Sequence, residues 1–169
     1  MSRVPDQHRS EAPRVVCCVV VTVSDTRTFE TDTGGRTIVD LLTKAGHEVV
    51  DRRIIADEPL PMQQLLEGLR DRQDIDAILI TGGTGLGSRD QTFETVGRLL
   101  GKPMPGYGEL FRMLSYQEIG PAAMLSRAVG GLIGRTVILT MPGSRAAVQL
   151  AMQKLILPEL GHLVREARR

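Results

Sequence analysis

The 169-residue sequence contains no tryptophan and few other aromatic residues. Its aromatic side chains are Phe29, Phe93, Tyr107, Phe111 and Tyr116. Proteins that bind single-stranded nucleic acid stack successive bases on aromatic rings, so this scarcity argues against that class. Charge argues against it too, because 21 basic and 20 acidic residues give a formal net charge of only +1. We therefore expect no nucleic acid partner.

Cysteine is almost absent. The two cysteines, Cys17 and Cys18, are adjacent, and neighbours on a strand point to opposite faces. The sequence therefore excludes a disulfide framework and a cysteine-rich zinc site.

Long apolar runs are also missing. The longest, Val15–Val21, has seven residues, whereas a membrane helix needs about 20. Residues 1–13 are polar and lack the apolar stretch of a signal peptide. We expect a flexible N-terminal arm over residues 1–13, no membrane association and a cytoplasmic location.

Short β-branched runs alternate with segments of helical periodicity, a pattern typical of βαβ units and a parallel sheet covered on both faces. The predicted strands are 15–23, 49–55, 77–81 and 136–141, and the predicted helices are 38–45, 60–72, 91–100, 109–117 and 145–157. Gly101–Gly108 is predicted as a loop, and Pro158 predicts a kink or restart of the last helix. The length suits one domain, so we predict an α/β fold over residues 14–169. It should have three α/β/α layers and a doubly wound, mostly parallel sheet.

The residues after each predicted strand are the candidate site, because open α/β sheets bind ligands beyond the carboxyl ends of their strands. These segments are Ser24-Asp25-Thr26, Asp57-Glu58, Thr81–Asp90 and Pro142-Gly143-Ser144. The third is a glycine-rich turn between a strand and a helix, an arrangement whose free N–H groups bind phosphate. A simple tight turn is the alternative. The turn has neither the dinucleotide-binding spacing nor the lysine of a P-loop.

Asp57 and Asp90 are the carboxylates expected to share this cleft, where they could hold Mg²⁺ beside bound phosphates. Each has a structural alternative. Ser88 and Gln91 have capping-box spacing, which would put Asp90 in the first helical turn, and Asp57 could cap the helix predicted after it. Spacing alone leaves both interpretations open.

Ser144 could bind a second phosphate, although capping of the following helix is favoured from the sequence. Ser24 and Asp25 allow the same two interpretations.

Six segments stand out together across residues 14–161. They are Thr22-Val23-Ser24-Asp25-Thr26, Asp57-Glu58, Thr81-Gly82-Gly83-Thr84-Gly85 with Arg89-Asp90 and Thr92, Pro105-Gly106-Tyr107-Gly108-Glu109, Met124-Leu125-Ser126-Arg127 and Met141-Pro142-Gly143-Ser144. In this order and spacing they resemble the MoaB/MogA family of molybdenum cofactor biosynthesis proteins. One departure is Gly34-Gly35, where many family members have Ser-Gly, which puts a hydroxyl contact there in doubt.

The resemblance implies a protein that binds molybdopterin and adenylylates its terminal phosphate with Mg²⁺-ATP, releasing pyrophosphate. By position, it implies catalytic and metal-binding roles for Asp57 and Asp90. The implied ligand contacts are Ser24, Asp25, Thr81, Gly82, Gly83, Thr84, Gly85, Glu109, Ser126, Pro142, Gly143 and Ser144, with no firm role for Glu109 or Ser126.

The resemblance further implies a homotrimer, or a pair of trimers. The alternatives are a non-catalytic molybdopterin carrier that hands its ligand to another biosynthesis protein, and a nucleotide-binding module unrelated to pterins.

Overall fold

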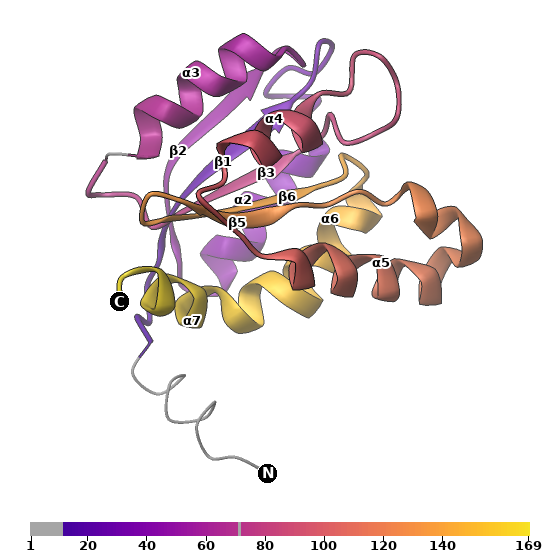
Figure 1. Cartoon of the computed structure of the whole chain (residues 1–169). Coiled ribbons are helices and arrows are strands. Elements are labelled where there is room, and N and C mark those ends of the chain that lie inside the picture. The colour runs from indigo at the N-terminus through magenta and orange to yellow at the C-terminus, as the bar shows by residue number, and fades with distance from the viewer. Residues whose placement is uncertain (1–11, 71) are drawn as a thin grey trace.

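A computed structural model describes residues 12–70 and 72–169 (Figure 1). Its sheet has the strand order β2-β1-β3-β6-β5-β4. The strands are β1 (Cys17–Val23), β2 (Glu48–Ile55), β3 (Ala77–Thr81), β4 (Lys102–Pro103), β5 (Gly130–Ile133) and β6 (Thr136–Met141). Neighbours among β2, β1, β3 and β6 pair in parallel, and the two short strands extend the sheet by antiparallel pairing. The N-terminal arm predicted for residues 1–13 lies outside the described residues except at its last two positions.

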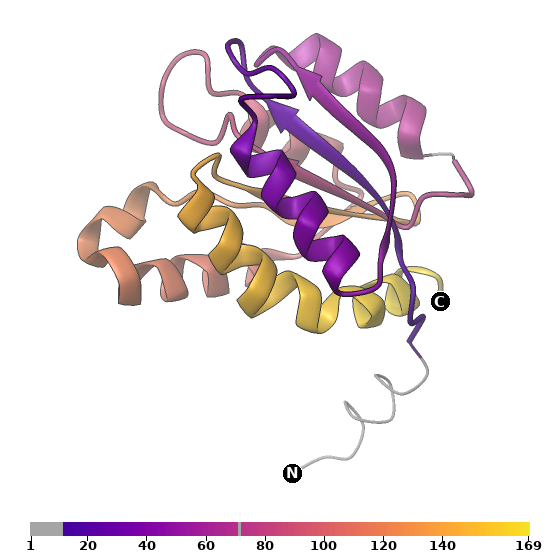
Figure 2. The ribbon, with the colours of Figure 1, turned by 180° about the vertical axis from the view of Figure 1, so that it is seen from behind.

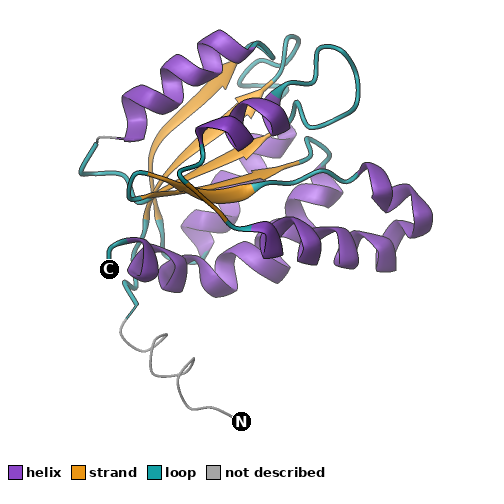
Figure 3. Ribbon diagram, viewed as in Figure 1, coloured by secondary structure: helices purple, strands orange, loops and turns teal. Residues whose placement is uncertain are grey.

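The helices cover both faces of this sheet (Figures 2 and 3). They are α2 (Thr33–Lys44), α3 (Pro59–Arg70), α4 (Thr92–Leu99), α5 (Pro105–Ile119), α6 (Arg145–Ala151) and α7 (Leu157–Ala167), with a 3₁₀ turn η1 (Gly120–Leu125) and a π turn η2 (Met152–Ile156). The predicted single three-layer α/β domain with a mostly parallel sheet is confirmed.

Alternation along the buried strands divides the core in two. Cys18 and Val20 of β1 face a cluster formed with α2, α5, α6 and α7. Val19 and Val21 face a second cluster formed with α3 and α4. Because successive side chains of a strand point to opposite faces, one apolar run supplies both cores.

The segment predicted as a loop, Gly101–Gly108, instead forms β4 and the first turn of α5. Pro105 is tolerated because it stands at the start of α5, where its missing N–H is not needed. Gly131 allows β4 to approach: a Cβ there would lie 2.2 Å from the carbonyl oxygen of Lys102. The prediction of a loop over Gly101–Gly108 is therefore wrong. Gly131 allows Lys102–Pro103 to pair as a strand, and Pro105 is compatible with the start of a helix.

Two predictions about where helices end or restart are confirmed. Gly46, just past the end of α2, has a φ of +83°, the left-handed conformation expected after a helix. Pro158 is the second residue of α7, which directly follows η2, so regular α-helix restarts next to this proline as predicted.

Among the described residues, no helix combines the length and the apolar composition needed to cross a bilayer.

Gly131→Ala should lower the free energy of unfolding by about 2 kcal/mol or more, because the new methyl group would collide with the β4 backbone. The matched change Gly97→Ala should raise it by about 0.4–1 kcal/mol, since a Cβ there meets no atom within 4 Å and α4 gains a better helix former. Urea unfolding of both variants measures the difference. Equal effects would contradict the close β4–β5 approach.

Candidate functional site

The four predicted segments lie at one edge of the sheet. Their strands, β1, β2, β3 and β6, are parallel neighbours, so their carboxyl ends lie at a common edge. Ser24, Asp57, Gly82 and Pro142 follow these ends within two residues. The predicted convergence is confirmed as geometry, and the binding roles of these residues stay predictions.

Asp57 is the most buried carboxylate of this edge that has no cationic partner among its hydrogen-bond donors. It is 8% exposed, and its Oδ1 accepts from the backbone N–H of Gln91 at 3.0 Å. Burial raises its pKa, the Gln91 hydrogen bond opposes that shift, and the charges of Asp90 and Asp25 add to it. Asp90 therefore lies close enough to Asp57 for the two charges to repel.

Asp25 connects the ends of β1 and β2 to the glycine-rich turn. Its Oδ1 accepts from the N–H of Asp57 at 3.0 Å, and its Oδ2 accepts from Arg89 at 2.9 Å. These two hydrogen bonds, the one from Arg89 foremost, lower the pKa of Asp25. Asp25 thus stays ionised and fixes the main chain of its neighbour.

The glycines after β3 allow both candidate carboxylates to touch the main chain. A Cβ on Gly83, whose φ is +62°, would lie 2.5 Å from Asp57 Oδ2. A Cβ on Gly85 would lie 2.6 Å from Asp90 Oδ2. The same Asp90 oxygen accepts from the N–H of Gly87 at 3.0 Å. Side chains at positions 83 and 85 would therefore displace the carboxylates.

Both structural alternatives for the aspartates need correction. Helix α4 begins at Thr92 after Gln91, whose side chain donates to the Ser88 carbonyl, so the predicted capping box does not form. Asp90 consequently lies before the helix and not in its first turn. Asp57 accepts a hydrogen bond from the N–H of Gln91 at the start of α4, and so it does not cap α3, the helix that follows it in sequence.

Arg127 fixes the turn through two of its carbonyl groups, a role that the sequence did not reveal. Its guanidinium donates to the carbonyls of Thr84 and Gly85, pairs with Glu94 at 2.5 Å and stacks over Phe93. Because carbonyls accept these bonds, they leave the N–H groups of Thr84 and Gly85 available to a ligand, whereas those of Gly82 and Gly87 already donate to Met141 and Asp90. The segment Met124–Arg127 is one of the family motifs, which draws attention to Arg127. No local sequence pattern, however, indicates which groups Arg127 would contact.

A cavity of about 360 Å³ lies beside the turn, over the ends of β1, β3 and β6. The predicted residues among its lining are Ser24, Thr81, Gly82, Gly143 and Ser144. Asp57 and Asp90 lie outside it. The cavity and the two carboxylates thus lie next to each other along the same edge of the sheet.

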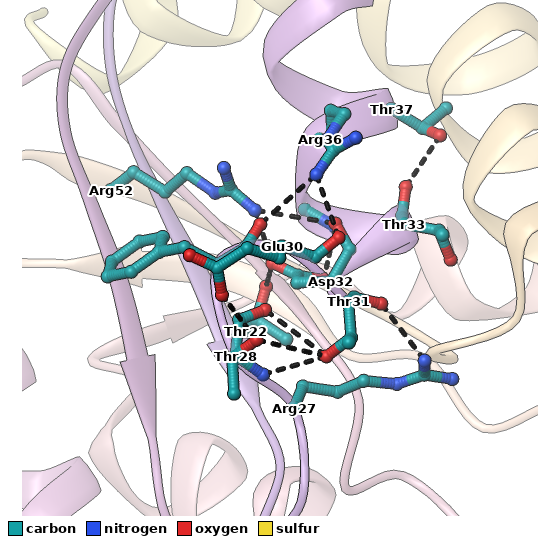
Figure 4. A network of polar contacts seen from close by, with 12 residues as sticks. Thr22, Arg27, Thr28, Glu30, Thr31, Asp32, Thr33, Arg36, Thr37 and Arg52 are labelled. Atoms are coloured by element: carbon teal, nitrogen blue, oxygen red, sulfur yellow. Dashed lines mark hydrogen bonds and ion pairs between the residues drawn. The ribbon is translucent and has the colours of Figure 1, made fainter.

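Sequence reasoning also missed the network that closes this cavity (Figure 4). Asp32, 2% exposed, accepts from Thr22 at 2.7 Å, from Arg52 at 2.8 Å and from the N–H of Gly35 at 2.8 Å. Burial acts to raise the pKa of Asp32, but these hydrogen bonds outweigh it and the net shift is downward. The ionised carboxylate therefore fixes the N-terminus of α2 at the cavity wall, next to Gly34.

The remaining predicted residues are spread around this edge. Ser144 accepts from the N–H of Ala147 at 3.3 Å, so the favoured capping interpretation is confirmed. Ser24 accepts from the N–H groups of Thr26 and Arg27. Ser126 and Pro142 line an adjoining depression of about 210 Å³ that Ser144 also borders.

Glu109 lies apart from these residues. It is exposed and borders a separate depression with Phe93 and Arg112. The structure does not bring it to the cavity beside the turn.

The donor set fits Mg²⁺ shared with a ligand better than a closed protein cage. Residues 12–70 and 72–169 contain no group of three His, Cys, Asp or Glu side chains that could hold a metal ion. The Oγ1 of Thr92 is buried without a hydrogen-bond partner, and it and Asp57 Oδ2 both face Gly83. Mg²⁺ is commonly bound by one or two carboxylates together with waters and substrate phosphates. Asp57 and Asp90 could supply those carboxylates.

Asp57→Asn should raise the free energy of unfolding of the ligand-free protein at neutral pH by about 0.5–2 kcal/mol. The amide removes a buried charge beside Asp90 and Asp25 while its oxygen can still accept from Gln91. The gain should be full above the raised native pKa and vanish below the ordinary value of 3.8, where Asp57 is protonated in both states.

Thermal unfolding across pH measures this effect, with Asp40→Asn, an exposed position in α2, as the control. A lower midpoint for Asp57→Asn at neutral pH would show that the ionised carboxylate stabilises the fold.

Comparisons with known proteins agree with this geometry. A family model described as "Probable molybdopterin binding domain" matches residues 19–162. The chain is 52% identical over 162 residues to molybdenum cofactor biosynthesis protein B of Halalkalibacterium halodurans, covering 95% of each chain. It is 50% identical to the protein of the same name from Bacillus subtilis, covering 96% of each.

Solved structures give the same result. A crystal structure of a molybdenum cofactor biosynthesis protein B, 52% identical, matches with a TM-score of 0.90 over 94% of this chain and 99% of the other. The tungsten cofactor synthesizing protein MoaB of Pyrococcus furiosus, 34% identical, matches with a TM-score of 0.82 over 94% and 100%. The chain therefore belongs to the MoaB family of molybdenum cofactor biosynthesis proteins.

Proposed function

We propose that this protein binds molybdopterin and transfers the adenylyl group of ATP to its terminal phosphate. An oxygen of that phosphate forms a bond to the α-phosphorus of ATP, and the bond from the α-phosphorus to the bridging oxygen of the β-phosphate breaks. Pyrophosphate leaves with that electron pair. No protein nucleophile is needed, because the attacking phosphate is already anionic at neutral pH.

The main obstacle is repulsion between two polyanions. At ~4 Å and an effective dielectric of about 20, each pair of unit charges costs roughly 4 kcal/mol. The N-terminus of α2 offers positive partial charge at the wall of the cavity, and the N–H groups of Thr84 and Gly85 offer it in the turn next to the cavity. Mg²⁺ held by Asp57 and Asp90 would offset further negative charge. The protein's task is then to position its substrates.

One observation carries the proposal: two mutually repelling carboxylates pack against glycines of a strand-to-helix turn. The hydrogen bond from Gln91 requires only an acceptor oxygen, so it does not explain why a negative charge is buried at Asp57 beside like charges, and the arrangement points to a cation shared with a ligand. The neighbouring cavity has room for the phosphorylated end of a substrate.

Asp90→Asn should reduce the rate of adenylylated pterin formation by at least about 100-fold, because a metal-holding charge is lost. Molybdopterin affinity measured without ATP should change by less than about threefold, since the Gly87 contact can be kept by the amide oxygen. The assay incubates purified protein with molybdopterin, ATP and Mg²⁺ and detects product by liquid chromatography. Asp40→Asn is the matched control.

A variant with an undiminished rate would remove Asp90 from the reaction. If the unmodified protein binds molybdopterin without consuming ATP, the carrier alternative replaces the enzymatic one.

We also propose that copies of this chain assemble, with a homotrimer as the expected state. Helix α5 and the turn η1 expose six large apolar side chains, each at least 47% exposed. They are Leu110, Met113, Tyr116, Ile119, Met124 and Leu125. Apolar patches of this kind on a folded protein mark interaction surfaces. In Figure 1 these elements extend from one side of the domain, where a second copy could reach them.

Met113→Glu should weaken self-association by at least about tenfold, because it would bury a charge in this patch. Light scattering coupled to size-exclusion chromatography measures the assembly mass against concentration. Gln117→Glu adds the same charge at an already polar position of α5 and is the control. Unchanged mass for Met113→Glu would exclude this face as the contact between copies.

A further inference from the structure

We infer that Arg27 binds the terminal phosphate of molybdopterin, an inference that rests on the proposed function. Arg27 lies in the segment between β1 and α2, and it lines the cavity of about 360 Å³ beside the glycine-rich turn. Among the described residues of that lining, Arg27 and Asp32 are the charged ones. Sequence reasoning did not single out Arg27, although it found the residues on either side of the cavity.

The negative charge of Asp32 is compensated within the cavity wall. Arg52, which is not part of the lining, pairs with Asp32 at 2.8 Å, and Thr22 donates to the same carboxylate at 2.7 Å. Figure 4 shows the side chain of Arg27 extending on the side of Thr33, away from Arg52. Asp32 therefore neither neutralises Arg27 nor presents an uncompensated charge to an anion.

The guanidinium of Arg27 has no carboxylate partner in residues 12–70 and 72–169. Its Nη1 donates to the carbonyl of Thr31 at 2.9 Å, a bond that orients the side chain within its own loop. The acidic residue closest to it in sequence, Asp25, is paired with Arg89 at 2.9 Å. Because a guanidinium carries several N–H groups in one plane, those of Nε and Nη2 stay available to a ligand.

Neutral groups alone would hold a phosphate less firmly, because several of them are already bonded. The hydroxyl of Thr22 donates to Asp32, and that of Thr81 donates to a backbone carbonyl at 3.1 Å. The N–H of Gly35 also donates to Asp32. Arg27 thus supplies the full positive charge of this cavity, and its planar N–H groups match phosphate oxygens in pairs.

The location of Arg27 assigns it to the phosphate of the pterin and not to the nucleotide. Asp57 and Asp90, which could hold Mg²⁺ with ATP, lie outside the cavity. Arg27 can therefore contact a phosphate in the cavity before ATP arrives. A contact that is equally strong before and during transfer strengthens binding without accelerating the chemical step. Arg27 should accordingly affect KM for molybdopterin and leave kcat nearly unchanged.

Molybdopterin titrated anaerobically into the full-length protein, without ATP or Mg²⁺, tests this contact by calorimetry. Arg27→Gln should weaken binding by about tenfold, the loss expected for a charged hydrogen-bonding group. Arg53→Gln, which removes the same charge from an exposed residue of β2 outside the cavity, should change the affinity by less than twofold. Equal losses in both variants, or none in Arg27→Gln, would overturn the inference.

Molybdopterin from which a phosphatase has removed the terminal phosphate separates a direct contact from support of the loop. Arg27→Gln and the unmodified protein should bind this ligand within twofold of each other. A tenfold difference that persists without the phosphate would show that Arg27 only shapes the loop, and would overturn the inference.

Transfer kinetics distinguish this inference from the proposed reaction. With ATP and Mg²⁺ present, Arg27→Gln should raise KM for molybdopterin by about tenfold and change kcat and KM for ATP by less than twofold. A fall in kcat at unchanged KM for molybdopterin would overturn the binding role. If the unmodified protein binds molybdopterin but forms no product, the proposed transfer fails, and the calorimetry still decides the role of Arg27.

Discussion

The close approach of two carboxylates to a main chain without side chains is the constraint on which this site depends. Asp57 and Asp90 occupy space that a methyl group on Gly83 or Gly85 would fill. Their position brings negative charge to the point where the backbone N–H groups of the turn concentrate positive potential. The glycines thus act by being small, since any larger residue would separate the charges from the turn.

Two further networks make this approach rigid from outside the turn. Arg127 binds the carbonyls of Thr84 and Gly85, while Asp32 connects β1, β2 and the start of α2. Both use ionised groups that are well paired, in contrast to the unpaired charge of Asp57. The hydrogen bonds and ion pairs of Arg127 and Asp32 offset the repulsion between Asp57 and Asp90. The neighbouring elements thus supply the free energy that holds the two carboxylates in place.

The sequence predicts much of this architecture because its strongest signals are local. Val15–Val21 and Ala77–Ile80 are continuous apolar runs, and Gly46 marks a helix end. The pairing of β4 with β5 escapes prediction because it depends on a contact between Gly131 and Lys102, almost thirty residues apart. Local patterns carry no information about such a contact.

The candidate site shows the same difference between features that local sequence patterns predict and features that depend on distant contacts. Its edge of the sheet follows from the strand pattern, and the family resemblance directs attention to Asp57 and Asp90. What Asp57 contacts could not be predicted, since its acceptor role lies at the start of a helix 35 residues downstream. The roles of Arg127 and Asp32 could not be predicted for the same reason, because these side chains bind backbone groups and side chains of other elements.

The π turn η2 has a consequence for the C-terminal part of the chain. The buried residues Val148, Met152, Ile156, Leu160 and Val164 recur every fourth position. In an ideal α-helix, with 3.6 residues per turn, a spacing of four drifts by about 40° at each step and would rotate this row away from the sheet. The wider turn absorbs one residue, which is about 100° of the roughly 160° that four such steps accumulate, so the row stays against the core for its full length. Deleting a single residue there should restore regular α-helical hydrogen bonding and leave the residues that follow, including the arginines at the end of the chain, facing the same neighbours.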